Sequence, residues 1–131
     1  MTCPNCGSDQ VVFPVPDAVH DHLPDDRPAA TICTHCLYVG PADDAPADYP
    51  DLSSTVSDAF PDDGETAAVL ASLLALLDRL VLHRQDADAV ATEAESHGVD
   101  VLLFLDRLAA DDTLDPHFDV TRRREQLQQL I

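Results

Sequence analysis

The chain has 131 residues, which is enough for one compact domain or two small ones. It carries 25 acidic and 7 basic side chains, for a formal net charge of −18, and it has abundant aspartate but no lysine. A hydrophobic content of 45% with clear helical periodicity excludes an acidic disordered chain for most of the sequence. Such a composition is typical of adaptation to molar salt, where a screening length of about 3 Å suppresses repulsion within the surface.

The four cysteines form two CxxC pairs, Cys3 with Cys6 and Cys33 with Cys36. Four thiolates at this spacing predict one tetrahedral zinc site. A disulfide framework would need an oxidising compartment, and no signal peptide precedes Cys3, so we expect reduced cysteines in the cytoplasm. Iron is the alternative metal, because an all-sulfur tetrahedral site also suits it.

The residues around each pair predict two tight turns, which we call the first knuckle (residues 3–7) and the second knuckle (residues 33–37). Pro4 fixes φ inside the first knuckle, and Gly7 can adopt the left-handed conformation that aims backbone amides at the sulfur atoms. Both residues argue against a redox CxxC, which opens a helix. The second knuckle has Leu37 in place of glycine and must therefore turn around a β-carbon.

Short β runs next to the knuckles predict a zinc ribbon over residues 1–41. The polar segment Asp17–Arg27 is expected as a loop or a single helical turn. The three expected strands are Gln10–Val15, Ala29–Cys33 and Leu37–Val39, the last closed by Gly40 and Pro41. A module of this size is too small to bury its own core, so we expect the metal to supply most of its folding free energy, commonly about 10 kcal/mol or more.

Residues 42–61 are rich in Pro, Ala and Asp and predict a linker between the ribbon and a helical half over residues 62–131. Within this linker, Ser54–Phe60 is expected to form one helical turn. Val56 and Phe60 would dock that turn onto a neighbouring element.

Apolar residues at helical spacing predict four helices in the helical half. The first is expected to be central, to start at a capping box of Asp62 with Glu65 and to reach about His83, with Val81 and Leu82 in its stripe. The others are expected from Asp86 to Gly98, from Val101 to Ala110 behind Asp100, and from Asp119 onward with Val120, Leu127, Leu130 and Ile131 facing inward. The predicted class is α+β, a small N-terminal β zinc ribbon followed by a C-terminal bundle of three to four helices.

The CPNCG sequence of the first knuckle, the second CxxC and the acidic composition resemble the haloarchaeal small CPxCG-related zinc-finger proteins. The second pair departs from that pattern, with Thr34 for proline and Leu37 for glycine. The resemblance covers the ribbon, and the helical half resembles an uncharacterised haloarchaeal domain. It implies zinc binding through Cys3, Cys6, Cys33 and Cys36 and a cytoplasmic location, and it implies no reaction.

The favoured function is that of an interaction or adaptor protein with structural zinc, because four protein ligands leave no open position for a catalytic water. The alternative is a transcription-associated zinc ribbon that binds nucleic acid, since the helices on either side of Gly98 have the order of a helix-turn-helix. The would-be recognition helix, Asp100–Asp106, offers aspartates and leucines, whereas base readout uses Arg, Asn or Gln. An enzyme is not expected, because the sequence has no Gly-rich phosphate loop, nucleophile elbow or HExxH motif.

The remaining candidate binding residues are histidines and arginines. Three histidines near the knuckles are candidates for replacing a cysteine or binding a second metal, although such residues are more often solvated: His20, His22 and His35. Three others are expected to cap helices or face solvent: His83, His97 and His117. The basic cluster Arg122–Arg124 is expected to pair with nearby aspartates rather than with phosphate.

We expect a protein partner of unknown identity and no membrane contact. The most apolar stretch, Ala67–Leu82, is short and is interrupted by Asp78 and Arg79, so it is not predicted to span a bilayer.

Overall fold

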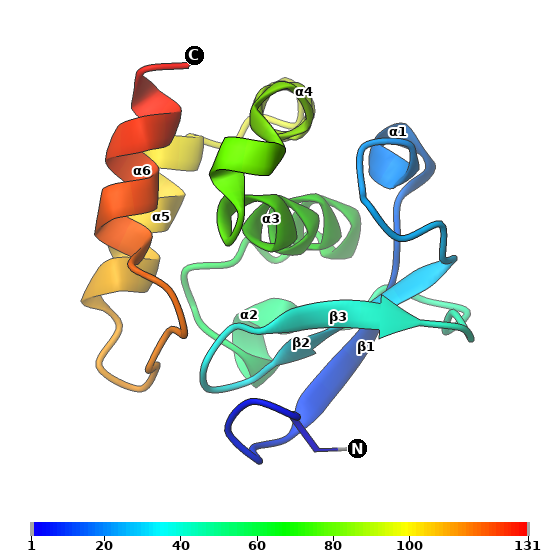
Figure 1. The fold of residues 1–131 in the computed structure, drawn as a ribbon. Coiled ribbons are helices and arrows are strands. Elements are labelled where there is room, and N and C mark those ends of the chain that lie inside the picture. Colours follow the sequence, from blue (N-terminus) through cyan, green and yellow to red (C-terminus); the bar gives the residue numbers. More distant parts are fainter. Residues whose placement is uncertain (1, 131) are drawn as a thin grey trace.

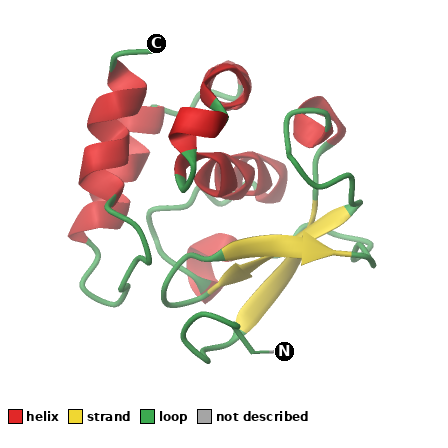
Figure 2. Cartoon of the chain, viewed as in Figure 1, coloured by secondary structure: helices red, strands yellow, loops and turns green. Residues whose placement is uncertain are grey.

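Strand β2 (Ala29–Cys33) is the middle of the N-terminal sheet, and all five of its residues are buried. In the computed structural model, which describes residues 2–130, it pairs antiparallel with β1 (Gln10–Pro14) and with β3 (Val39–Ala42). Helices form most of the rest of the chain (Figures 1 and 2). The α+β prediction is therefore confirmed, with a small three-stranded sheet in the N-terminal part.

Strand β3 begins and ends later than predicted. The expected strand Leu37–Val39 was to stop at Gly40 and Pro41, but both of these residues lie within β3. Leu37 cannot be part of the strand because its φ is +65°, in the left-handed region. Pro41 pairs with Ala30 and is tolerated because β3 is an edge strand, where proline interrupts no further ladder.

Helix α3 (Gly64–Leu77) is the central helix, as predicted, and eleven of its 14 residues are buried. It lies between the sheet and the next helix along the chain (Figure 1). Its cap is Asp63, and not Asp62 with Glu65 as predicted. The Asp63 carboxylate accepts hydrogen bonds from both the amide and the hydroxyl of Thr66, so a start one residue later satisfies two donors.

The chain leaves α3 sooner than predicted, at Leu77 rather than near His83. Arg79 adopts φ −125° and ψ 53°, which lies outside the α region. One turn of 3-10 helix follows, η1 (Leu80–Leu82). This early turn lets the next helix pass back over α3, whereas a straight continuation would carry the chain away from the core.

The turn changes which apolar side chains are buried. Leu80 is buried, but Val81 and Leu82 are 69% and 71% exposed, so their predicted place in the core stripe is wrong. Helix α4 (Arg84–Ser96) begins two residues before its expected cap, Asp86. It packs on α3 through its predicted face, which consists of Ala87, Val90, Ala91 and Ala94.

Helices α5 (Val101–Ala110) and α6 (Val120–Gln128) pack side by side at one edge of the molecule (Figure 1). Their predicted starts are confirmed, because Asp100 and Asp119 each accept a hydrogen bond from a backbone amide of the first turn. Gly98 ends α4 with a φ of +90°, also as predicted.

The inner face of α6 is only partly as predicted. Val120 and Leu127 are buried, whereas Leu130 is 37% exposed. Ile131, which was also assigned to this face, lies outside the described residues.

Two short helices complete the chain, α1 (Asp17–His20) in the predicted loop and α2 (Leu52–Thr55) in the predicted linker. Helix α2 overlaps the predicted turn Ser54–Phe60 but begins two residues earlier, because Asp51 caps it by accepting the Ser53 amide, and it ends at Thr55. Val56 and Phe60 follow α2 and are both buried, as expected for docking residues.

One hydrophobic core connects the sheet with the helices. The ribbon was expected to be too small to bury a core, but its apolar side chains join those of the later helices in a single cluster. Members from successive parts of the chain are Phe13, Ile32, Leu37, Leu52, Phe60, Leu70, Leu74, Leu105 and Leu127. The sheet is therefore held by side-chain packing on the helices as well as by its own ladder.

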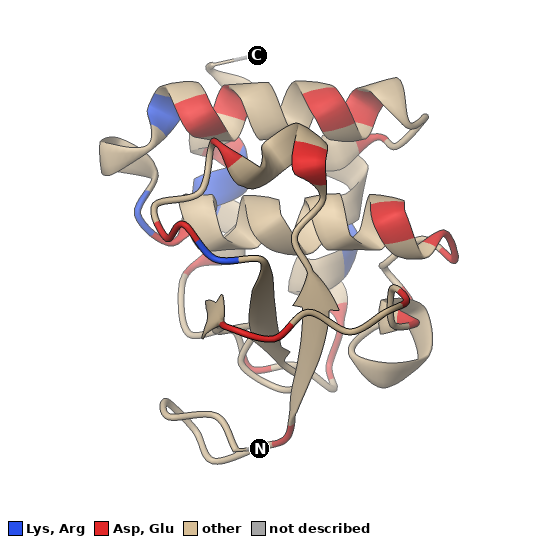
Figure 3. Ribbon diagram, turned by 90° about the vertical axis from the view of Figure 1, so that its right-hand side faces the viewer, with Lys and Arg blue, Asp and Glu red and all other residues tan. Residues whose placement is uncertain are grey.

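Acidic residues lie in the loops and on most of the helices but not within β1, β2 or β3, whereas most of the arginines visible in Figure 3 lie towards the left of that view. None of the helices within residues 2–130 has the length and apolar character needed to cross a bilayer.

Candidate metal centre

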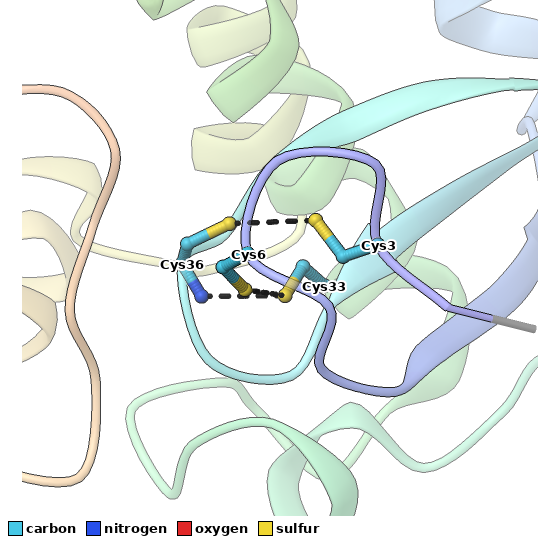
Figure 4. Close-up of side chains that lie close together, drawn as sticks. All are labelled: Cys3, Cys6, Cys33 and Cys36. Carbon is cyan, nitrogen blue, oxygen red and sulfur yellow. Dashed lines mark hydrogen bonds between the residues drawn. The ribbon is translucent and has the colours of Figure 1, made fainter.

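The two knuckles bring the four cysteine sulfur atoms to within 4.8 Å of one another (Figure 4). The Sγ atoms of Cys3 and Cys36 are 3.6 Å apart, and those of Cys6 and Cys33 are 3.4 Å apart. A disulfide requires about 2.05 Å, so all four are free thiols. A tetrahedral ion with metal–sulfur bonds of about 2.3 Å spaces its sulfurs about 3.8 Å apart. The cluster therefore fits one metal ion, as predicted.

The first knuckle is closed by its own backbone. The Gly7 amide donates to the Cys3 carbonyl at 2.9 Å, with Gly7 at a φ of +80° as predicted. The amide of Asn5 donates to Cys3 Sγ at 3.3 Å, and its side-chain Nδ2 donates to Cys36 Sγ at 3.5 Å. These donors stabilise sulfur charge, as the groups around metal-bound thiolates do.

The second knuckle repeats this geometry without glycine. The amides of His35 and Cys36 donate to Cys33 Sγ at 3.4 and 3.3 Å. Leu37 stands where Gly7 stands in the first knuckle, and it is likewise left-handed, with a φ of +65°. That conformation costs a non-glycine residue roughly 1–2 kcal/mol. Complete burial of the Leu37 side chain contributes about 1.5–3 kcal/mol and offsets the cost.

The thiols differ in acidity because hydrogen bonds dominate at one of them and burial dominates at two others. Hydrogen bonds from the Ser8 side chain and amide lower the pKa of the exposed Cys6 to about 5. Burial raises the pKa of Cys36 to about 12, although Asn5 and the Tyr38 amide hydrogen-bond to it. Burial likewise raises the pKa of Cys33. A metal ion at this site must therefore displace protons from the buried pair.

The second knuckle is attached to the helical part of the chain through the loop between α5 and α6. The His117 amide and Nδ1 donate to the Cys36 carbonyl at 2.9 and 3.0 Å, and the Asp115 amide donates to the His35 carbonyl at 2.8 Å. His117 Nε2 lies 3.1 Å from Asp78 Oδ2 at the end of α3, although the pair is not aligned as a hydrogen bond. His117 thus links a metal-binding turn to the central helix.

Sequence reasoning missed this role of His117, which was expected to cap a helix or face solvent. Its side chain is only 15% exposed. The contact joins positions separated by 81 residues, so no local sequence pattern predicts it.

The other candidate histidines do not join the sulfur cluster. Among residues 2–130, the potential metal-binding group contains the four cysteines alone. His22 Nδ1 lies 3.0 Å from Asp86 Oδ1, and His20 Nε2 lies 3.4 Å from Asp26 Oδ1. The His35 side chain is exposed and is not part of the sulfur cluster.

The basic cluster on α6 is largely engaged within the molecule. Arg124 Nε lies 3.0 Å from Asp106 Oδ1, as expected for pairing with an aspartate. Arg123 donates to Gln126 Oε1 at 2.9 Å and to the Asp78 carbonyl at 3.5 Å. The cluster is therefore not a continuous free basic face.

A comparison with protein families matches the chain over residues 2–131 to a family of unknown function (DUF6276). Neither a curated protein nor a solved structure matches it.

Proposed function

We propose that this chain, which belongs to a family of unknown function (DUF6276), binds one structural zinc ion through its four cysteines and serves as an interaction or adaptor protein. The observation that carries the proposal is the spacing of the four Sγ atoms, which suits a tetrahedral ion and no disulfide. Zinc is favoured over iron because it is the common ion of paired CxxC turns within a β ribbon.

A structural role follows from the ligand set. Four thiolates fill the coordination of zinc and leave no position for a reacting water. The ion would fasten the first knuckle to the second, and the second is already attached to α3 through His117. Zinc would therefore hold the N-terminal end of the chain on the shared core.

The proposed setting is a salt-rich cytoplasm of the haloarchaeal kind. The formal charge of −18 without any lysine and the resemblance of the first knuckle to small CPxCG-related zinc fingers support it. Four free thiols agree with a reducing compartment.

Nucleic-acid binding is the weaker candidate. The third predicted helix, now α5, buries Phe104 against Phe60 at 5.1 Å between ring centroids and carries Asp106 paired with Arg124. The formal net charge of −18 disfavours binding to a polyanion, and contacts between arginine and phosphate weaken further at molar salt.

An enzymatic role is also disfavoured. Thr66 Oγ1 lies 3.0 Å from His97 Nδ1, and His97 Nε2 lies 2.8 Å from Glu93 Oε2, which is the order of a nucleophile, a base and an orienting acid. However, the Thr66 hydroxyl donates its one proton to Asp63, and Thr66 is only 4% exposed. The group is better explained as a reinforced cap of α3.

The test is metal analysis of protein purified without added metal. We expect one zinc per chain by elemental analysis and native mass spectrometry, and a cobalt-substituted form with intense visible bands and thiolate charge-transfer bands. The Cys33→Ser variant should lose the ion. Iron at one per chain, or no metal at all, would contradict the proposal.

A further inference from the structure

The turn between α3 and α4 leaves an apolar surface without a partner. Val81 and Leu82 of η1 are the two most exposed large hydrophobic side chains among the described residues, and Leu130 after α6 is a third exposed one. A shallow pocket of about 170 Å³ lies between η1 and the end of α6. We call this surface the η1 corner, made of Leu80, Val81, Leu82, Arg84, Gln126, Gln129 and Leu130.

The charge of the η1 corner is opposite to that of the molecule. The pocket lining contains Arg84 and two glutamines and no carboxylate. Residues 79–85 and 126–130 contain no acidic residue, although the chain has 25. Within residues 2–130, the arginine ion pairs are Arg27 with Asp43 and Arg124 with Asp106, so that Arg84 at the η1 corner has none.

This combination points to a particular kind of occupant. Exposed aliphatic side chains require apolar groups on the other side of a contact, and the unpaired Arg84 requires a carboxylate. In a two-fold contact with a second copy, both copies would present the same surface, so Arg84 would meet no carboxylate from the η1 corner. A nucleic acid would satisfy Arg84 but would leave Val81 and Leu82 without apolar partners.

We propose that the η1 corner binds an acidic peptide segment of a partner protein, with an apolar side chain in the pocket and a carboxylate beside Arg84. This inference rests on the proposed interaction function and assigns its surface. The apolar contact supplies affinity that persists at high salt, and Arg84 orients the segment.

The test uses a fluorescein-labelled amphipathic helical peptide of glutamate and leucine, with a lysine-for-glutamate peptide as its charge control. Fluorescence anisotropy should show saturable binding of the acidic peptide and none of the basic one. Leu82→Ser should raise Kd by about tenfold or more, because it removes a branched side chain from the contact. Arg84→Gln should weaken binding more at low than at molar KCl.

Leu103→Ser is the matched control. Leu103 is 53% exposed on α5 and lies beside a different pocket, which contains Asp100. It should leave Kd unchanged. The inference is overturned by the absence of saturable binding, by an equal loss with Leu103→Ser, by preferred binding of an oligonucleotide, or by self-association that Leu82→Ser abolishes.

Zinc content and circular dichroism of each variant separate this inference from the proposed function. Failure of the peptide to bind a folded chain with one zinc contradicts the docking surface alone. A folded wild-type chain without zinc contradicts the proposed function instead.

Discussion

His117 and Cys36 are joined by two hydrogen bonds that end on the same oxygen. The His117 amide reaches the Cys36 carbonyl at 2.9 Å and its Nδ1 at 3.0 Å. The ring also stacks edge-on against Tyr38, with centroids 5.6 Å apart. A residue late in the chain therefore positions the backbone of a cysteine in the second knuckle.

Replacing this histidine should loosen the attachment without removing the metal. We expect His117→Ala to lower the free energy of unfolding by about 1–2 kcal/mol, because a partly buried hydrogen bond and the contact with Asp78 are lost. Zinc should stay at one per chain. The measurement is denaturant unfolding with elemental analysis. His83→Ala is the control, because the histidines with ion pairs within residues 2–130 are His20, His22, His97 and His117. An equal loss in the free energy of unfolding for the two variants would contradict the linking role of His117.

Loss of a single ligand should affect more than the ribbon. Cys33→Ser is expected to release zinc, and because Phe13, Ile32 and Leu37 share one core with α3, it should also lower the stability of the helices. Thermal unfolding followed by circular dichroism should show one transition at lower temperature. Thr34→Ser keeps a hydroxyl for the Asp9 carbonyl and serves as the control in the same turn. A helical signal that melts at the wild-type temperature would mean that the two parts are energetically independent.

Zinc affinity should rise with pH across the neutral range. Burial raises the pKa of Cys36 to about 12 and also raises that of Cys33, so both are protonated at neutral pH without metal. Each bound ion must displace at least these two protons, so zinc affinity rises as the proton concentration falls. Chelator competition at several pH values should give a logarithmic affinity that increases steadily with pH. A flat profile would show that the buried thiols are already ionised.

Leu37 allows a test of strain against burial. Leu37→Ala keeps the left-handed φ of +65° and loses the buried side chain, so it should cost about 2–5 kcal/mol. Leu37→Gly loses the same contacts but relieves the backbone, so it should be less damaging than alanine by about 1 kcal/mol. Gly7→Ala is the converse control, since nothing lies within 4 Å of the added Cβ and only the φ of +80° is strained. A higher denaturant midpoint for Leu37→Ala than for Leu37→Gly would contradict backbone strain at this position.

Salt should stabilise the protein. With 25 acidic against 7 basic side chains, screening relieves repulsion first, and salting-out then strengthens apolar burial. We expect Tm to rise from dilute to molar KCl in a calorimetric series. A Tm that is flat or falls over this range would remove the halophilic interpretation.

The sequence by itself determined the features that depend on a few neighbouring residues. The spacing of Cys3 and Cys6 and of Cys33 and Cys36 predicted the sulfur cluster, because each pair needs only one tight turn. Strand β2 and helix α5 have the predicted bounds. A side-chain cap begins α5, and burial on both sides of the strand marks β2 as the middle of the sheet.

The features that depend on packing between distant segments were visible only in the tertiary structure. They are the end of α3 at Leu77, the exposure of Val81 and Leu82, and the contact of His117 with the second knuckle. The tertiary structure also buried Leu37 in a conformation that glycine normally takes. Local patterns state what a segment can form, but the free energy of burying side chains against partners far along the chain selects among those possibilities.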